Sequence, residues 1–159
     1  MKVDTEISIQ ASPERIWNIL TAFDAYPEWN PYIQAVRGEV AHDAKVEMDI
    51  RYLQGMDKGL DAIESALITA LAPPKYLSWV WNHPFGNWWL SAERVFRIKQ
   101  RDDGKVFFFH EIYFTGFSTV KVLGFLDFRR DALEQKVKLS MIRMNEALKA
   151  RAEHAPPPP

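Results

Sequence analysis

The side chains that could carry acid–base or metal chemistry are few and widely spaced. The four histidines form no pair four residues apart, and no cluster of acids adjoins them at metal-ligand spacing; they are His42, His83, His110 and His154. The sequence contains no cysteine, which excludes disulfides, thiolate metal sites and a cysteine nucleophile. A phosphate loop and a dinucleotide fingerprint are also missing. We therefore predict no metal and no cofactor.

His110 is the histidine best placed for a functional role. It shares strand alternation with Val106, Phe108, Ile112 and Phe114, which form the more apolar face of that segment. An inward His110 could contact a ligand or move a proton. The alternative is a core histidine that hydrogen-bonds to a backbone carbonyl.

Glu111 and Tyr113 occupy the opposite face of the same segment, which also carries two phenylalanines. Both faces are thus aromatic, and parity does not decide which one is turned inward. Burial would raise the pKa of an inward Glu111, which could then act as an acid or base. The alternative is a carboxylate at the sheet surface, paired with a neighbouring-strand cation such as Arg94 or Arg97.

Arg94 is the candidate for binding an anionic group of a ligand. It falls in register with Leu90, Phe96 and Ile98, which would turn it toward an apolar interior. There its guanidinium could bind a ligand carboxylate or phenolate. Alternatively, the side chain extends to the rim of the sheet and keeps its charge in water.

Hydrophobic alternation predicts a series of strands that would position these residues. The predicted strands cover residues 3–9, 32–36, 45–52, 77–82, 88–99 and 106–114. Residues 60–72 fit both a helix and a strand, and Pro73-Pro74 ends that segment in either case. Loops are expected at 53–59 and 83–87, and a tight turn at 101–105.

Two kinds of helix are expected. Ser12-Pro13-Glu14 predicts the start of a short helix that ends near residues 21–23, followed by a turn or brief helical piece. Residues 128–153 form a long amphipathic helix whose apolar stripe includes Met141 and Met144. Because helices and strands do not alternate regularly, we predict an antiparallel sheet and the α+β class.

The length and the net charge of the chain limit the kinds of protein that it can be. A chain of 159 residues fits a single domain over 1–154, followed by a disordered proline tail at 155–159. The net charge of -1, without a long basic run, argues against nucleic-acid or anionic-membrane binding. The first residues lack a signal core, and no stretch is long enough to span a bilayer. We expect a cytoplasmic protein, monomeric or homodimeric.

Four segments, taken together, carry a family resemblance. They are ISIQASPERIWNILTAFDAYPEWNPYI (7–33), LAPPKYLSWVW (71–81), HEIYFTGF (110–117) and MNEALKARAE (144–153). In this order they resemble the START-like (SRPBCC) superfamily, the polyketide cyclase/dehydrase and lipid-transport family. The resemblance implies a helix-grip fold: a curved sheet of about seven strands wrapped around the C-terminal helix, with two short helices after the first strand. It implies that 63–71 is a strand and that a hydrophobic cavity lies between sheet and helix.

The leading functional hypothesis is binding of a small hydrophobic molecule, aromatic or lipid-like, in this cavity. The expected contacts are Trp29, Met48, Trp79, Trp81, Arg94, His110, Glu111, Tyr113, Met141 and Met144. An alternative is an enzyme of the polyketide cyclase or dehydratase type, which would need at least two of His110, Glu111 and Tyr113 inside the cavity. A further alternative is a protein-interaction module, which predicts a collapsed cavity filled by aromatic side chains.

Overall fold

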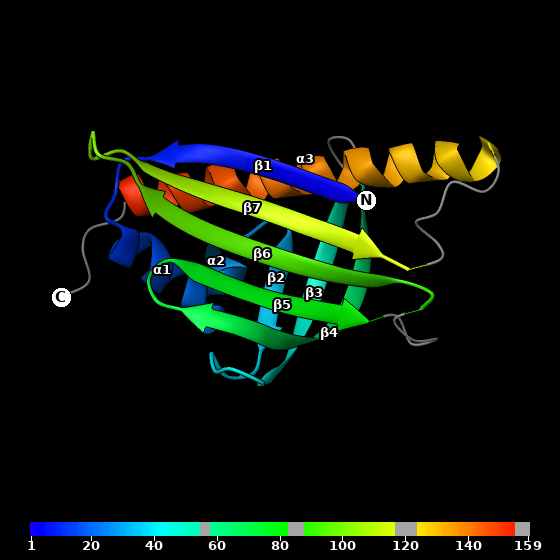
Figure 1. Cartoon of the computed structure of the whole chain (residues 1–159), viewed down its shortest axis with the longest axis horizontal. Coiled ribbons are helices and arrows are strands. Elements are labelled where there is room, and N and C mark those ends of the chain that lie inside the picture. The colour runs from blue at the N-terminus through cyan, green and yellow to red at the C-terminus, as the bar shows by residue number, and fades with distance from the viewer. Residues whose placement is uncertain (55–57, 83–87, 117–123, 155–159) are drawn as a thin grey trace.

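A seven-stranded antiparallel sheet wraps around one long helix in the computed structural model, which describes residues 1–54, 58–82, 88–116 and 124–154 (Figure 1). The strands are β1 (Lys2–Ile9), β2 (Ile33–Arg37), β3 (Lys45–Gln54), β4 (Lys58–Ala72), β5 (Tyr76–Asn82), β6 (Ser91–Gln100) and β7 (Val106–Thr115). The helical elements are α1 (Pro13–Thr21), the 3-10 helix η1 (Phe23–Ala25), α2 (Tyr26–Trp29) and α3 (Gly124–His154). The predicted α+β helix-grip fold is confirmed.

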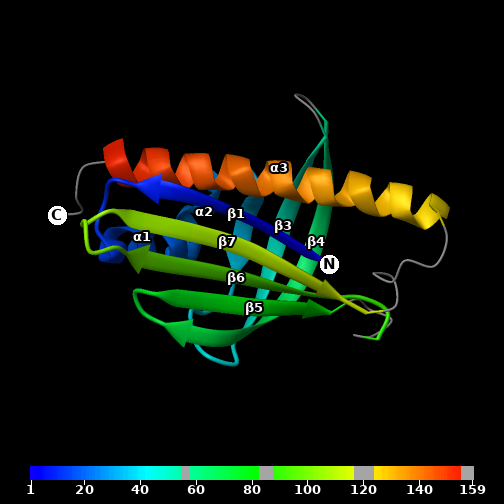
Figure 2. The same ribbon diagram turned by 45° about the horizontal axis from the view of Figure 1, so that its top comes forward.

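The strand order across the sheet is β1-β7-β6-β5-β4-β3-β2. Strands β2 to β7 follow one another as antiparallel neighbours, while β1 pairs with β7 at the far edge. The sheet curls, so that β3 and β4 cross behind α3 at a steep angle to β1, β7 and β6 (Figure 2). One face of the sheet is therefore concave and is covered by α3.

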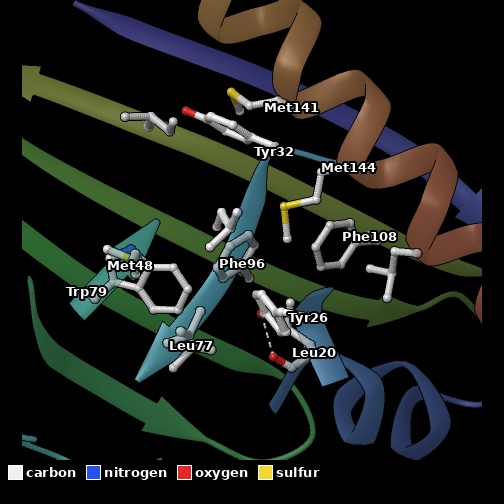
Figure 3. Close-up of a cluster of buried hydrophobic side chains, with 14 of the residues drawn as sticks. Leu20, Tyr26, Tyr32, Met48, Leu77, Trp79, Phe96, Phe108, Met141 and Met144 are labelled. Carbon is white, nitrogen blue, oxygen red and sulfur yellow. Dashed lines mark hydrogen bonds between the residues drawn. The ribbon is translucent and has the colours of Figure 1, made fainter. Parts of the chain in front are cut away.

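The predicted apolar stripe of α3 faces the sheet. Val137, Met141, Met144 and Leu148 have no exposed surface. Met141 and Met144 project toward the aromatic side chains of the core (Figure 3). This burial supplies most of the helix's stability, because a lone amphipathic helix cannot hide its own stripe.

Hydrogen bonds hold the last turns of α3 against the beginning of the chain. The Lys149 ammonium donates to the Ser8 carbonyl at 2.8 Å, and the Gln10 amide donates to the Glu153 carboxylate at 2.7 Å. The Arg15 guanidinium donates to the Ala152 carbonyl at 2.5 Å. The C-terminal half of α3 is thus fixed to β1 and α1.

The predicted start of the first helix is confirmed. The Ser12 hydroxyl accepts a hydrogen bond from the Arg15 amide at 3.2 Å, and Pro13 begins α1. The next turns bring Tyr26 into the core, where its hydroxyl donates to the Leu20 carbonyl at 2.6 Å. The predicted brief helical piece corresponds to η1 and α2.

Two sequence predictions differ from the structure. The loop expected at 53–59 is strand at 53–54 and 58–59, because Gln54 pairs with Lys58, while 55–57 lie outside the described residues. The strand expected from Trp88 begins at Ser91. The ambiguous segment 60–72 is strand, as the family resemblance implied. The loop predicted at 83–87 and the tail at 155–159 lie outside the described residues.

Strand β4 turns two large apolar side chains away from the helix. Ile63 is 73% exposed and Leu67 is also exposed, whereas Ala66 and Ile68 are buried on the concave face. Pairing with β3 sets this register, because Met48 lies opposite Glu64. The described inward positions of β4 are therefore occupied by Ala62, Glu64, Ala66 and Ile68.

Asn30 fixes the chain where it enters β2. Its buried side-chain oxygen accepts hydrogen bonds from the Tyr32 amide at 3.0 Å and the Ile33 amide at 2.9 Å. These bonds orient Tyr32, which is fully buried.

Replacing Asn30 by alanine should lower the free energy of unfolding by about 2 kcal/mol, because two buried amides lose their acceptor. Urea unfolding followed by circular dichroism would measure it. Asn18→Ala, at an exposed position on α1, is the control and should change stability by less than about 0.5 kcal/mol. Equal effects of the two substitutions would contradict the proposed role of Asn30.

Candidate functional site

The concave face of the sheet carries a buried guanidinium at its centre. Arg94 on β6 is only 5% exposed. It donates through Nη2 to the Tyr32 hydroxyl at 2.9 Å, and its guanidinium carbon lies 4.7 Å from the centre of the Tyr32 ring. Its Nη1 lies 2.9 Å from Nε2 of His110. Arg94 is therefore inward, as its register predicted.

The contact with Arg94 fixes the tautomer of His110. A guanidinium can only donate, so Nε2 of His110 must be the unprotonated acceptor, and the ring hydrogen sits on Nδ1. From there Nδ1 donates to the side-chain oxygen of Asn145 on α3 at 3.2 Å. Asn145 in turn donates to the Thr5 hydroxyl on β1 at 2.9 Å. His110 thus bonds to two side chains rather than to a backbone carbonyl.

His110 is held in its neutral form. Complete burial is the main cause that keeps its pKa well below the usual value, and the neighbouring Arg94 charge lowers that pKa further. The hydrogen bond to Asn145 acts in the opposite direction without reversing the result. The imidazole is consequently an acceptor whose lone pair is already occupied by Arg94.

The contacts described so far form a continuous polar chain, which consists of Thr5, Asn145, His110, Arg94 and Tyr32. A phenol and a carboxylate extend this polar chain on the other side of Arg94. The Tyr52 hydroxyl donates to Glu64 at 2.6 Å, and its ring centre lies 5.6 Å from that of Tyr32. Burial is the first cause that raises the pKa of both phenols above the ordinary value. Both therefore remain protonated and able to donate. Burial lowers the pKa of Arg94, but the nearby Tyr32 and the negative charge of Glu64 raise it, so the guanidinium stays charged.

The sheet register explains why these side chains meet. Arg94 lies opposite Ile112, and Phe96 lies opposite His110, so Arg94 and His110 are diagonal neighbours on one face. Thr5 is directly opposite His110 on β1. The polar chain therefore crosses strands that are far apart in the sequence.

Packing on the concave face is uneven. Its centre is filled by side chains with at most 1% exposure, among them Trp79, Phe96 and Phe108 (Figure 3). Toward the end where β3, β5 and β7 finish, the inward positions become half-buried, including Tyr52, Glu64, Trp81 and Ala92. Trp81 and Ala92 are directly paired, which makes them neighbours at this end. We call the part of the concave face that these four residues form the half-buried end.

Four of the apolar residues predicted as ligand contacts lie in the packed centre. Met48 and Trp79 are 1% exposed, and Met141 and Met144 are fully buried. Contact with a ligand would require these side chains to move, which methionine does most readily. Their role as ligand contacts stays a prediction.

The other two predicted aromatic contacts lie apart from each other. Trp29 packs against Tyr26 on α2, with ring centres 5.1 Å apart. The neighbouring Glu28 is ion-paired with Arg151 in the last turns of α3. Trp81, by contrast, belongs to the half-buried end. The structure therefore does not bring Trp29 and Trp81 together.

Glu111 and Tyr113 lie on the convex face of the sheet. Both oxygens of Glu111 are engaged by cations, Arg97 at 2.5 Å and Lys2 at 2.9 Å. The Lys2 ammonium also lies 5.6 Å from the centre of the Tyr113 ring. The ion pair with a neighbouring-strand cation that was considered for Glu111 is therefore present, with Arg97 as partner, although Glu111 is only 4% exposed. Of the three candidates for proton transfer, His110 alone faces α3.

Sequence reasoning missed several members of the polar chain. They are Thr5, Tyr32, Tyr52, Glu64 and Asn145. One signal was available, because Asn145 follows Met141 by four residues and precedes Leu148 by three, and so interrupts the apolar stripe of α3. Glu64 gave no such signal, since its inward position depends on the register with β3.

Two hollows of about 450 and 480 Å³ lie outside this region. The first adjoins Gln34 and Ile63, and the second adjoins Ser12 and Gly104.

Among the described side chains, no three His, Asp or Glu residues gather as metal ligands. Within the part of the chain that the structure describes, no helix is both long and apolar enough to cross a membrane.

Comparison with known proteins is consistent with this architecture. A family model described as polyketide cyclase / dehydrase and lipid transport matches residues 1–153. No curated protein sequence matches the chain. A START superfamily protein from Mycobacterium smegmatis has a TM-score of 0.67 at 18% identity, over 95% of this chain and 96% of its own.

Two further solved structures share the fold. The Aha1 dimer from Colwellia psychrerythraea matches over 99% of both chains, with 16% identity and a TM-score of 0.63. The di-domain ARO/CYC protein BexL from the BE-7585A biosynthetic pathway has a TM-score of 0.72 at 13% identity. That match covers 98% of this chain and 51% of BexL. At these identities the likeness concerns the fold alone.

The neutral state of His110 predicts a pH-dependent stability. Below about pH 6.5 the unfolded chain binds a proton on this histidine and the folded protein does not, so stability falls as the pH falls. Urea unfolding of wild type and His110→Gln at pH 7.5 and pH 5 would measure this. The stability of wild type relative to the variant should drop by about 2 kcal/mol over that interval, at up to about 1.4 kcal/mol per pH unit.

The other titrating groups are the same in wild type and His110→Gln, so their contributions to the pH dependence of stability cancel in this comparison. His42→Gln replaces an exposed histidine and should follow the wild-type curve. If the difference between wild type and His110→Gln were the same at both pH values, His110 would not be the buried neutral group described above.

Proposed function

Because the chain belongs to the polyketide cyclase / dehydrase and lipid transport family, we propose that it binds a small hydrophobic molecule between the sheet and α3. The ligand enters at the half-buried end, and Arg94 with its two phenols orients a polar group on it. This proposal includes lipid-like and aromatic molecules.

The buried Arg94 is the observation that carries the proposal. A guanidinium removed from water is costly to the fold, and replacing such buried charges by apolar side chains often leaves stability unchanged or improves it. A role in recognising a polar group supplies a reason for keeping this charge. Tyr32 and His110 hold it in one orientation, as a preorganised site requires.

The surroundings of Arg94 suit an apolar ligand body. Trp81 and Ala92 line the half-buried end, and Phe114 lies opposite Ala92 on the next strand. Burying ligand surface against such side chains supplies about 25 cal/mol for each Å² removed from water. The polar contacts would then mainly select orientation.

Of His110, Glu111 and Tyr113 only His110 faces α3, so the catalytic alternative does not meet the condition set for it with those residues. A catalytic role that uses the Tyr52–Glu64 pair at the half-buried end instead is the second candidate. A phenol that donates to a carboxylate is a possible proton-transfer pair for a carbonyl substrate. His110 is a weaker candidate, since its acceptor nitrogen is engaged by Arg94. Mass spectrometry of a ligand after incubation with the protein separates the two functions. A binding protein returns the ligand unchanged, whereas a cyclase or dehydratase would release a product of altered mass or structure.

Native mass spectrometry of the purified protein, followed by denaturing extraction, would test binding. A bound hydrophobic molecule should appear, and added ligand should raise the melting temperature, since saturation at 100 times Kd contributes about 2.7 kcal/mol. Ala92→Trp should abolish both effects by filling the half-buried end. Ala72→Trp introduces the same ring at an exposed position of β4 and should leave them intact.

Two results would contradict this proposal, one for binding itself and one for its location. If no hydrophobic molecule copurifies and a panel of lipids and aromatics gives no melting shift, the binding function is wrong. If ligands bind equally well to folded Ala92→Trp, binding occurs but not at the half-buried end. Circular dichroism of each variant establishes that it is folded.

A further inference from the structure

We infer that Glu64 makes the site selective for a neutral polar group, such as a hydroxyl, phenol or ketone, over a carboxylate. The inference rests on the proposed function and specifies the class of ligand. It follows from the pairing of one buried cation with one inward carboxylate.

The concave face contains balanced charges. Among its sheet positions with described side chains, the charged residues are Arg94 and Glu64. Glu64 accepts from Tyr52 at 2.6 Å, the Tyr52 ring contacts the Tyr32 ring, and Tyr32 accepts from Arg94 at 2.9 Å. These contacts run from Glu64 through two phenols to Arg94, and the negative charge of Glu64 favours the charged form of Arg94. Arg94 therefore already has its counter-charge within the protein.

A ligand carboxylate would add a second negative charge to this balanced pair. In a partly desolvated site, repulsion between like charges is much stronger than in water. The carboxylate would also lose its own hydration, with only one cation to compensate two anions. The arrangement thus opposes carboxylates even though it contains an arginine.

A neutral polar group adds no charge to the pair formed by Arg94 and Glu64. A ligand hydroxyl can donate to Glu64 and accept from a phenol or from the guanidinium, which satisfies both of its hydrogen-bonding functions. A ketone can accept from Tyr32 or Arg94 without adding charge. Desolvation of such a group costs far less than desolvation of an anion.

Matched probes that differ only in the polar group would test the selectivity. The pairs are 1-dodecanol with dodecanoate and 2-naphthol with 2-naphthoate, titrated into the wild-type protein at pH 7.5 by isothermal calorimetry. In at least one pair, the neutral member should bind at least tenfold more tightly. Glu64→Gln keeps a hydrogen-bond acceptor for Tyr52 while removing the charge, and should reduce that ratio at least tenfold or reverse it.

Glu6→Gln is the matched control, because it removes one carboxylate from an exposed strand position. It should leave the ratio unchanged. If wild type binds the carboxylates as tightly as the neutral probes, or if Glu64→Gln leaves the ratio unchanged, the selectivity inference is overturned while the binding function stands. If neither member of either pair binds, the selectivity inference fails, while the binding function is judged by copurification and the ligand panel described above.

Discussion

Burial of one positive charge governs the interior of this protein. Arg94 is surrounded by Tyr32 and His110, and each of these depends on further groups for its own position. His110 is oriented by Asn145, while Tyr32 is oriented by the turn at Asn30. Because a buried charge without partners is strongly destabilising, these contacts must form together. The polar chain therefore links the helix to both halves of the sheet.

The helix has two distinct roles in this arrangement. Its apolar stripe, including Met141 and Leu148, closes the hydrophobic core. Asn145 interrupts that stripe and supplies the acceptor that holds His110. The last turns are fixed to β1 and α1 by hydrogen bonds from Lys149 and Arg15. Such fixed positions are what a preorganised polar site needs, because loose partners would give the arginine alternative orientations.

Packing along the concave face differs between the part that stabilises the fold and the end proposed to bind a ligand. At the centre, rings such as Trp79 and Phe96 fill the space and stabilise the fold, with centres 5.1 Å apart. At the half-buried end the packing is looser, and Glu64 and Trp81 are partly accessible. An apolar ligand can gain burial there without displacing the packed centre. One curved sheet thus carries the packed centre and the proposed binding end at different positions along its strands.

Local pattern was sufficient to predict most of the architecture, including the N-cap at Ser12, the strand alternation and the stripe of α3, because these depend on neighbouring residues. It also predicted that Arg94 faces inward. It did not predict which face of β7 is concave, or that Glu64 is inward while Ile63 is exposed. Those outcomes depend on strand register and on the curl of the sheet, which bring together residues distant in sequence. The charge balance of the interior was therefore decided by tertiary structure alone.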